Sequence, residues 1–86
     1  MTQSSSFYNV ITGMTECRIK ELIHYAEDMD ARERPVPEAS SYFRAHAVTV
    51  YLAWCDVTNG FHTVEDMNRL ETLTHSNTLA VGLSDF

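Results

Sequence analysis

The chain has 86 residues, of which 44% are hydrophobic, and it carries a formal net charge of −6 at pH 7. This length supports one domain, and the hydrophobic content lies above the range of disordered chains. The acidic balance repels nucleic acid and anionic membranes, so direct binding to either is not expected. Because so small a domain buries a limited fraction of its surface, we also expect it to form a homodimer.

The sequence lacks the usual marks of secretion and of membrane insertion. Residues 1–13 contain neither a basic start nor a continuous apolar segment, and no run reaches the roughly 18 apolar residues of a membrane span. Cys17 and Cys55 could form one disulfide, but both lie within apolar helical patterns, where a free thiol behaves as a small buried hydrophobe. These features predict a cytoplasmic protein with two reduced, buried cysteines.

The first thirty residues contain two apolar patterns that do not share a helical face. At 100° per residue the two faces point about 120° apart, so one straight helix cannot bury both. We therefore predict a short N-terminal helix that ends at Gly13, and a separate helix over about residues 15–30 with Thr15 as its N-cap. Residues 1–5 are predicted to be disordered. The first face consists of Phe7, Val10, Ile11 and Met14, and the second of Ile19, Leu22, Ile23, Ala26 and Met29.

A second long helix is predicted after a linker over residues 31–37, where Pro35 and Pro37 end the preceding helix. The stretch AHAVTVYLAWCDV, residues 45–57, is almost uninterrupted by polar side chains and favours a helix over about 38–58. A strand is the alternative, because VTVYLAW is rich in β-branched and aromatic residues. The length of the apolar pattern exceeds that of an ordinary strand and favours the helix.

A third helix is predicted over about residues 63–75. Asn59 and Gly60 are residue types that end helices, and Thr63 with Asp66 resembles a capping box. The chain then ends in an apolar C-terminal tail. Together these patterns predict an all-α fold: a single domain over residues 1–86 that forms a small bundle of three principal helices with a short N-terminal helix.

Side chains that could carry chemistry follow no recognisable pattern. The four histidines show no i, i+4 pairing and no Cys-x-x-Cys motif accompanies them. His46 falls on an apolar face, whereas His62 and His75 flank the third helix and are expected to be exposed. Neighbouring carboxylates point in different directions on a helix, and no nucleophile motif is present. We therefore predict no enzymatic activity, no catalytic residue, no metal and no cofactor.

Two other function classes are weaker alternatives. An acidic protein can imitate nucleic acid and block the basic groove of a nucleic-acid enzyme, but here the acids are interleaved with Arg and Lys. A small transcriptional regulator is the second alternative, with residues 63–75 as the recognition helix of a helix-turn-helix. That helix carries Glu65, Asp66 and Glu71 against Arg69, which is unfavourable for contacts to phosphate.

Protein binding is the function that the sequence favours. Aromatic residues are concentrated in the second helix and cover more than one of its faces, and such residues dominate binding hot spots. A bundle this small leaves helix faces open to a partner. We predict a non-enzymatic protein–protein interaction module, a homodimer that binds a protein target stoichiometrically. An inhibitor encoded by a phage or mobile element, a bacterial adaptor and an antitoxin all fit this description. The predicted partner-binding residues are Tyr42, Arg44, Tyr51, Trp54, Leu83 and Phe86.

Overall fold

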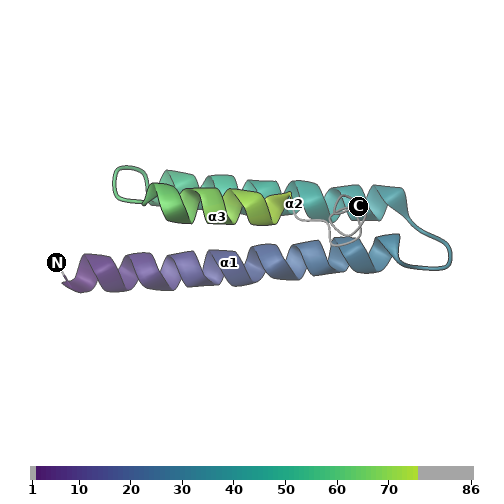
Figure 1. Cartoon of the computed structure of the whole chain (residues 1–86), viewed down its shortest axis with the longest axis horizontal. Coiled ribbons are helices and arrows are strands. Elements are labelled where there is room, and N and C mark those ends of the chain that lie inside the picture. Colours follow the sequence, from purple (N-terminus) through teal and green to yellow (C-terminus); the bar gives the residue numbers. More distant parts are fainter. Residues whose placement is uncertain (1, 76–86) are drawn as a thin grey trace, which may run out of the picture.

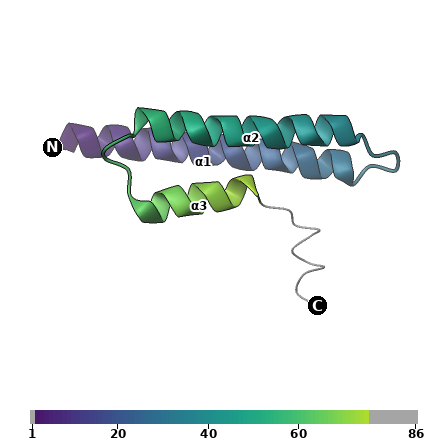
Figure 2. The same cartoon turned by 90° about the horizontal axis from the view of Figure 1, so that it is seen from above.

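The computed structural model describes residues 2–75, and this part of the chain folds into three helices without a strand. Helix α1 spans Thr2–Asp30, α2 spans Pro37–Val57 and α3 spans Val64–Thr74. α1 and α2 form a long antiparallel pair, and α3 packs along the half of that pair nearer the N-terminus (Figures 1 and 2). The all-α prediction is confirmed. The strand alternative is wrong, because residues 48–54 lie inside α2.

The N-terminal region does not divide into two helices. α1 runs without interruption from Thr2 through Gly13 to Asp30, so the joint at Gly13 and the N-cap at Thr15 were wrong. The backbone of residues 2–5, for which the sequence indicated disorder, belongs to the first turns of the same helix. The two apolar faces do point apart. The second lies mostly in the core, whereas Ile11 of the first packs against the core and Phe7, Val10 and Met14 stay exposed.

Replacing Gly13 by alanine tests the continuity of α1. A Cβ at this position would meet no atom within 4 Å, and the residue is exposed inside the helix. Alanine should therefore stabilise the protein by about 0.5–1 kcal/mol, because glycine loses more conformational freedom in a helix. Thermal unfolding followed by circular dichroism should show a midpoint raised by several degrees. At a concentration low enough to keep the chain monomeric, a lower midpoint would mean that Gly13 adopts a backbone conformation unlike that of a helix.

The face that α1 buries contains polar as well as apolar side chains. Its buried and half-buried positions alternate four and three residues apart, which is the heptad spacing of helices packed knobs-into-holes. α2 contributes a matching row of the same spacing. The row on α1 is Tyr8, Thr12, Thr15, Ile19, Leu22 and Ala26, and the row on α2 is Ser40, Arg44, Ala47, Tyr51 and Trp54, continued by the C-cap residue Thr58.

The ends of α2 and α3 follow the residue types that the sequence supplies. Pro37 occupies the first turn of α2, where its missing N–H costs no hydrogen bond. Gly60, with φ +94°, turns the chain between α2 and α3. The Thr63 side chain accepts a hydrogen bond from the Asp66 backbone N–H at 3.1 Å, which confirms the predicted start of α3.

The core brings all three helices together. Its buried side chains come from α1, α2 and α3, and they are Ile19, Leu22, Ile23, Ala47, Tyr51, Trp54 and Leu70. Leu70 is the one that α3 contributes, and it is fully covered. The two thiols are free in the structure, but Cys17 is exposed and Cys55 is half-buried. The prediction of burial was therefore wrong for Cys17, because its position on α1 faces away from the core row.

In the described part of the chain, no helix combines the length and the apolar character that crossing a membrane requires.

Candidate functional site

The two largest predicted contact residues belong to the core. Trp54 is 2% exposed and Tyr51 is 8% exposed, so neither offers a surface to a partner. The Trp54 indole N–H donates to Thr12 Oγ1 at 2.9 Å, which joins α2 to α1. Burial raises the pKa of the Tyr51 hydroxyl to about 12, with a further contribution from Cys55. Both side chains therefore lie in the core of the fold and not on its surface.

Arg44 also acts within the bundle. Its guanidinium donates to Asp30 Oδ2 at 3.0 Å, which ties α2 to the last turn of α1. Hydrogen bonds from Ser40 and then from Arg44 lower the pKa of the Asp30 carboxyl. Of the remaining predicted residues, Tyr42 is 65% exposed and available to a partner. Leu83 and Phe86, with the rest of the apolar tail, lie outside the described residues.

An aromatic row runs across the surface at the end of the α1–α2 pair that α3 does not reach. We use this name for His24 and Tyr25 of α1 together with Tyr42, Phe43 and His46 of α2. The ring centroids of Tyr25 and Phe43 lie 5.5 Å apart, those of Phe43 and Tyr42 5.6 Å, and those of Tyr42 and His46 6.1 Å. His24 extends the row, 6.4 Å from Tyr25. Tilted and edge-on rings at these separations attract one another beyond their burial of area.

The aromatic row faces away from α3. Glu16 of α1 pairs with Arg69 of α3, and Tyr25 lies nine residues further along, about half a turn round the helix axis. Tyr25 is 40% exposed and Tyr42 is 65% exposed, although both contact other rings. Within the described residues, the row therefore forms a surface of mutually contacting rings on which Tyr25 and Tyr42 stay exposed. Tyr42 was among the predicted contact residues and belongs to this row. The contribution of His24 and Tyr25 from α1 was not predicted from the sequence.

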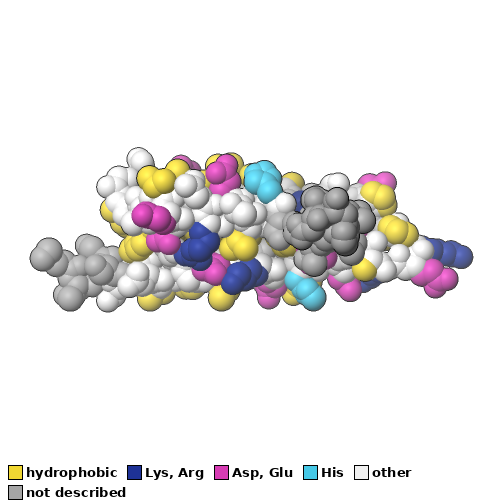
Figure 3. All heavy atoms as spheres, viewed as in Figure 1, with side chains coloured by type: hydrophobic (Ala, Val, Ile, Leu, Met, Phe, Trp, Pro, Cys, Tyr) yellow, Lys and Arg dark blue, Asp and Glu magenta, His cyan; other side chains and the backbone are white. Residues whose placement is uncertain are grey.

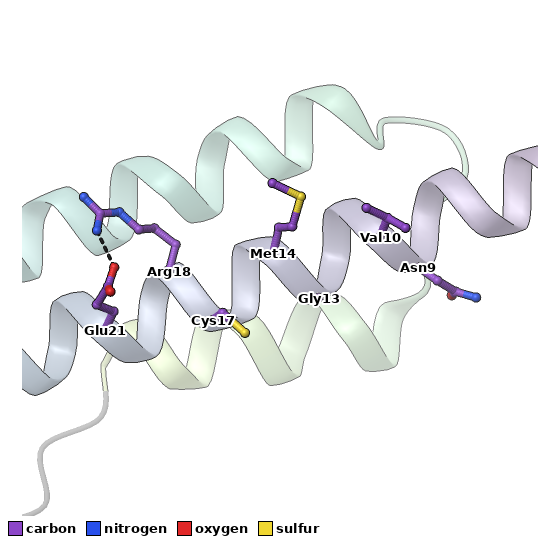
Figure 4. Close-up of a pocket in the computed structure, with 7 residues that line it drawn as sticks. All are labelled: Asn9, Val10, Gly13, Met14, Cys17, Arg18 and Glu21. Carbon is purple, nitrogen blue, oxygen red and sulfur yellow. Dashed lines mark hydrogen bonds and ion pairs between the residues drawn. The ribbon is translucent and has the colours of Figure 1, made fainter.

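A second apolar surface lies on the outer side of α1. Phe7 is 52% exposed, Val10 60% and Met14 66%, and Cys17 continues the same face. We call these four residues the outer stripe. Val10, Met14 and Cys17 of this stripe, with Asn9, Gly13, Arg18 and Glu21, line a shallow open hollow formed by α1 alone (Figure 4). Hydrophobic side chains also follow the edge of α1 that is remote from α2 in Figure 3.

A polar network that the sequence did not predict fixes α3 to α1. The Tyr8 hydroxyl donates to Asp66 Oδ2 at 2.5 Å, and Arg69 donates to Asp66 Oδ1 at 3.0 Å. Arg69 also forms an ion pair with Glu16, and Glu16 forms a second ion pair with Lys20, at 2.8 Å. These acidic and basic groups meet between α1 and α3 (Figure 3). The hydrogen bond from Tyr8, followed by that from Arg69, lowers the pKa of the Asp66 carboxyl.

His62 is part of the same end of the bundle and is half-buried, so the prediction of an exposed side chain was wrong. Its ring lies 5.2 Å from that of Trp54, and its Nδ1 is 3.1 Å from the hydroxyl of Thr58. Thr58 is fully buried and donates to the Trp54 carbonyl at 2.6 Å. His62 therefore packs against Trp54 at the edge of the core, and its hydrogen bond with Thr58 supports the fold.

The described residues do not gather three His, Cys, Asp or Glu side chains in a way that could hold a metal ion. The acids with lowered pKa values, Glu16, Asp30 and Asp66, owe the shift to hydrogen bonds within the bundle. Comparisons of the chain with protein-family models, with curated proteins and with solved structures find no match. The two exposed apolar surfaces are thus the features on which a functional hypothesis can rest.

Proposed function

We propose that the protein is a non-enzymatic protein–protein interaction module of the cytoplasm, a homodimer that binds a protein target stoichiometrically as an inhibitor or adaptor. The observation that carries this proposal is the aromatic row. Three large rings from two helices form one surface, in which Phe43 lies between Tyr25 and Tyr42, and Tyr42 is 65% exposed. Tyrosine is enriched among residues whose removal abolishes binding, because it buries a large area at a small cost in side-chain entropy.

The row has the properties of a preorganised contact surface. Its rings support one another, and α1 and α2 are held together at this end by the Arg44–Asp30 ion pair. A partner therefore does not have to order these side chains on binding, which reduces the cost of association. The phenol groups and the imidazoles of His24 and His46 add polar atoms at the edge of the apolar rings. The target we propose presents an apolar patch with hydrogen-bonding groups at its rim.

Affinity capture from the native host tests the proposal. The tagged chain should retain a protein in stoichiometric amount, and Tyr42→Ala should reduce its recovery at least tenfold, as expected for the loss of a hot-spot side chain. Leu52→Ala is the matched control, since Leu52 is also an exposed apolar residue of α2, at 53%. It should leave recovery unchanged. Equal recovery by both variants would remove the aromatic row from the binding surface.

The ionic strength of the capture buffer separates this proposal from nucleic-acid mimicry. Binding through aromatic rings should change little between low and moderate salt, because apolar contacts are not screened. A charge mimic would lose its target steeply over the same range. Such a loss, with Tyr42→Ala behaving as the unmodified chain does, would favour the mimic over the module proposed here.

A further inference from the structure

We infer that the outer stripe of α1 is the homodimer interface, and that it packs against the same stripe of a second copy with the two α1 helices antiparallel. This inference rests on the self-association part of the proposed function and is independent of target binding by the aromatic row. The stripe is Phe7, Val10, Met14 and Cys17, and it projects from the side of α1 opposite the core row.

The spacing of the stripe is that of a helix–helix seam. Its members are three, four and three residues apart, the alternation that keeps a row facing a partner helix along its length. The core row of the same helix has this period and is occupied by α2. α1 therefore carries two heptad seams, and within the described residues only one of them is covered. Gly13, beside Val10 and Met14 in Figure 4, has open space around it and permits close approach of a second helix.

The distribution of charge favours a second copy in this place. Residues 2–15 contain no charged side chain, although the chain as a whole has a net charge of −6. Residues 16–30 of α1 carry five acids against Arg18 and Lys20. Two copies that meet through the uncharged half therefore avoid the repulsion that contact elsewhere would create between acidic surfaces.

The same distribution selects the antiparallel arrangement. A parallel pair in register would place Glu21 against Glu21 of the second copy and bring the two acidic halves side by side. An antiparallel pair moves these halves to opposite ends of the dimer. The register that keeps all four stripe residues in contact places Val10 opposite Met14 and Phe7 opposite Cys17, and it places Arg18 near the uncharged Ser6.

The area available predicts a weak dimer. The stripe from Phe7 to Cys17 extends along about 15 Å of helix. With its flanking side chains, it can bury on the order of 1,000 Å² in two copies, which lies below the range of stable specific interfaces and within that of weak, transient ones. We therefore expect a dissociation constant in the micromolar range and a monomer–dimer equilibrium at accessible concentrations.

Sedimentation equilibrium over a range from micromolar to hundreds of micromolar tests the interface. The unmodified chain should show a monomer–dimer equilibrium. Met14→Glu should raise the dissociation constant at least tenfold, because it buries a carboxylate in the seam. Leu52→Glu adds the same charge at a similarly exposed position of α2 and should leave the constant unchanged. Circular dichroism should show equal helix content, since both side chains are more than half exposed.

Mild oxidation of a Cys55→Ala variant, in which Cys17 is the remaining thiol, tests the orientation. The antiparallel register separates the two Cys17 residues by about 15 Å along the axis, too far for a disulfide. The dimer should form without an intermolecular cross-link. Rapid cross-linking that Met14→Glu prevents would overturn the antiparallel arrangement.

The outcomes separate this inference from the proposed function. A chain that stays monomeric at hundreds of micromolar would overturn the homodimer in both. A dimer that Met14→Glu leaves intact would overturn only the assignment to the outer stripe. Tyr42→Ala should have the same oligomeric state as the unmodified chain at each concentration, since this substitution alters target binding alone.

Discussion

Trp54→Ala should destabilise the protein by about 3–5 kcal/mol, the range for truncating a large buried aromatic side chain. The indole is 2% exposed, contacts the rings of Tyr8, Tyr51 and His62, and donates a hydrogen bond to Thr12. Its loss would leave a cavity where the three helices meet and an unpaired hydroxyl on α1. Small domains have a total free energy of unfolding of about 5–15 kcal/mol, so Trp54→Ala would remove much of the stability of this protein. Urea unfolding followed by circular dichroism measures the change.

Tyr42→Ala is the control for Trp54→Ala, because it also truncates an aromatic residue of α2. Tyr42 is 65% exposed, so its removal should change the free energy of unfolding by less than about 1 kcal/mol. Trp54→Ala that unfolds at the same urea concentration as Tyr42→Ala would contradict the placement of Trp54 in the core. It would also reinstate Trp54 as a candidate for contact with a partner.

Leu70→Ala should release α3 from the α1–α2 pair. Leu70 is fully covered, and truncation of a buried leucine costs about 2–5 kcal/mol. α3 has only 11 residues, too few for a helix to be stable alone in water. Hydrogen exchange should therefore show fast exchange of the α3 amides, while those of α1 and α2 around Ala47 stay more protected.

Val64→Ala is the matched control on the same helix, since Val64 is 63% exposed. It should leave exchange in α3 unchanged. Uniform loss of protection over all three helices in Leu70→Ala would show instead that α3 and the helical pair unfold as one unit. Protection equal to that of the unmodified chain would contradict the packing of Leu70.

The positions of the helices could be predicted from local signals. Pro35 and Pro37 marked the linker, Gly60 the turn and Thr63 the start of α3, because each acts through its own backbone conformation or capping bond. The apolar stretch at residues 45–57 indicated a helix from its length. These signals depend on residues that are close in the sequence, so the packing of the helices does not change them.

The course of α1 could not be predicted in this way. Its core row includes Thr12 and Thr15, which are 5% and 8% exposed, so an analysis of hydrophobic spacing does not register its N-terminal half. Thr12 is satisfied by the Trp54 indole, 42 residues away in the sequence. A polar side chain buried through so distant a partner resembles a surface residue in its own sequence context. The apolar spacing of Phe7, Val10 and Met14 was real but marked a face that stays exposed.

The candidate surface was only partly predictable for a related reason. The concentration of aromatic residues in α2 was evident, but the sequence does not say which of them α1 and α3 cover. Tyr51 and Trp54 lie on the side of α2 that both helices contact, whereas Tyr42 lies outside it. Tyr25, which completes the row from α1, is placed beside Phe43 by the antiparallel pairing alone. The polar network of Tyr8, Asp66 and Arg69 depends on that packing as well.

Titration of the purified chain into the captured target, by calorimetry, tests the central claim that the aromatic row is the binding surface. The account predicts saturation at one target per chain. Tyr42→Ala should raise the dissociation constant at least tenfold, since a hot-spot side chain contributes about 2 kcal/mol or more. Leu52→Ala should bind as the unmodified chain does. Unchanged affinity of Tyr42→Ala in a correctly folded protein would contradict the claim.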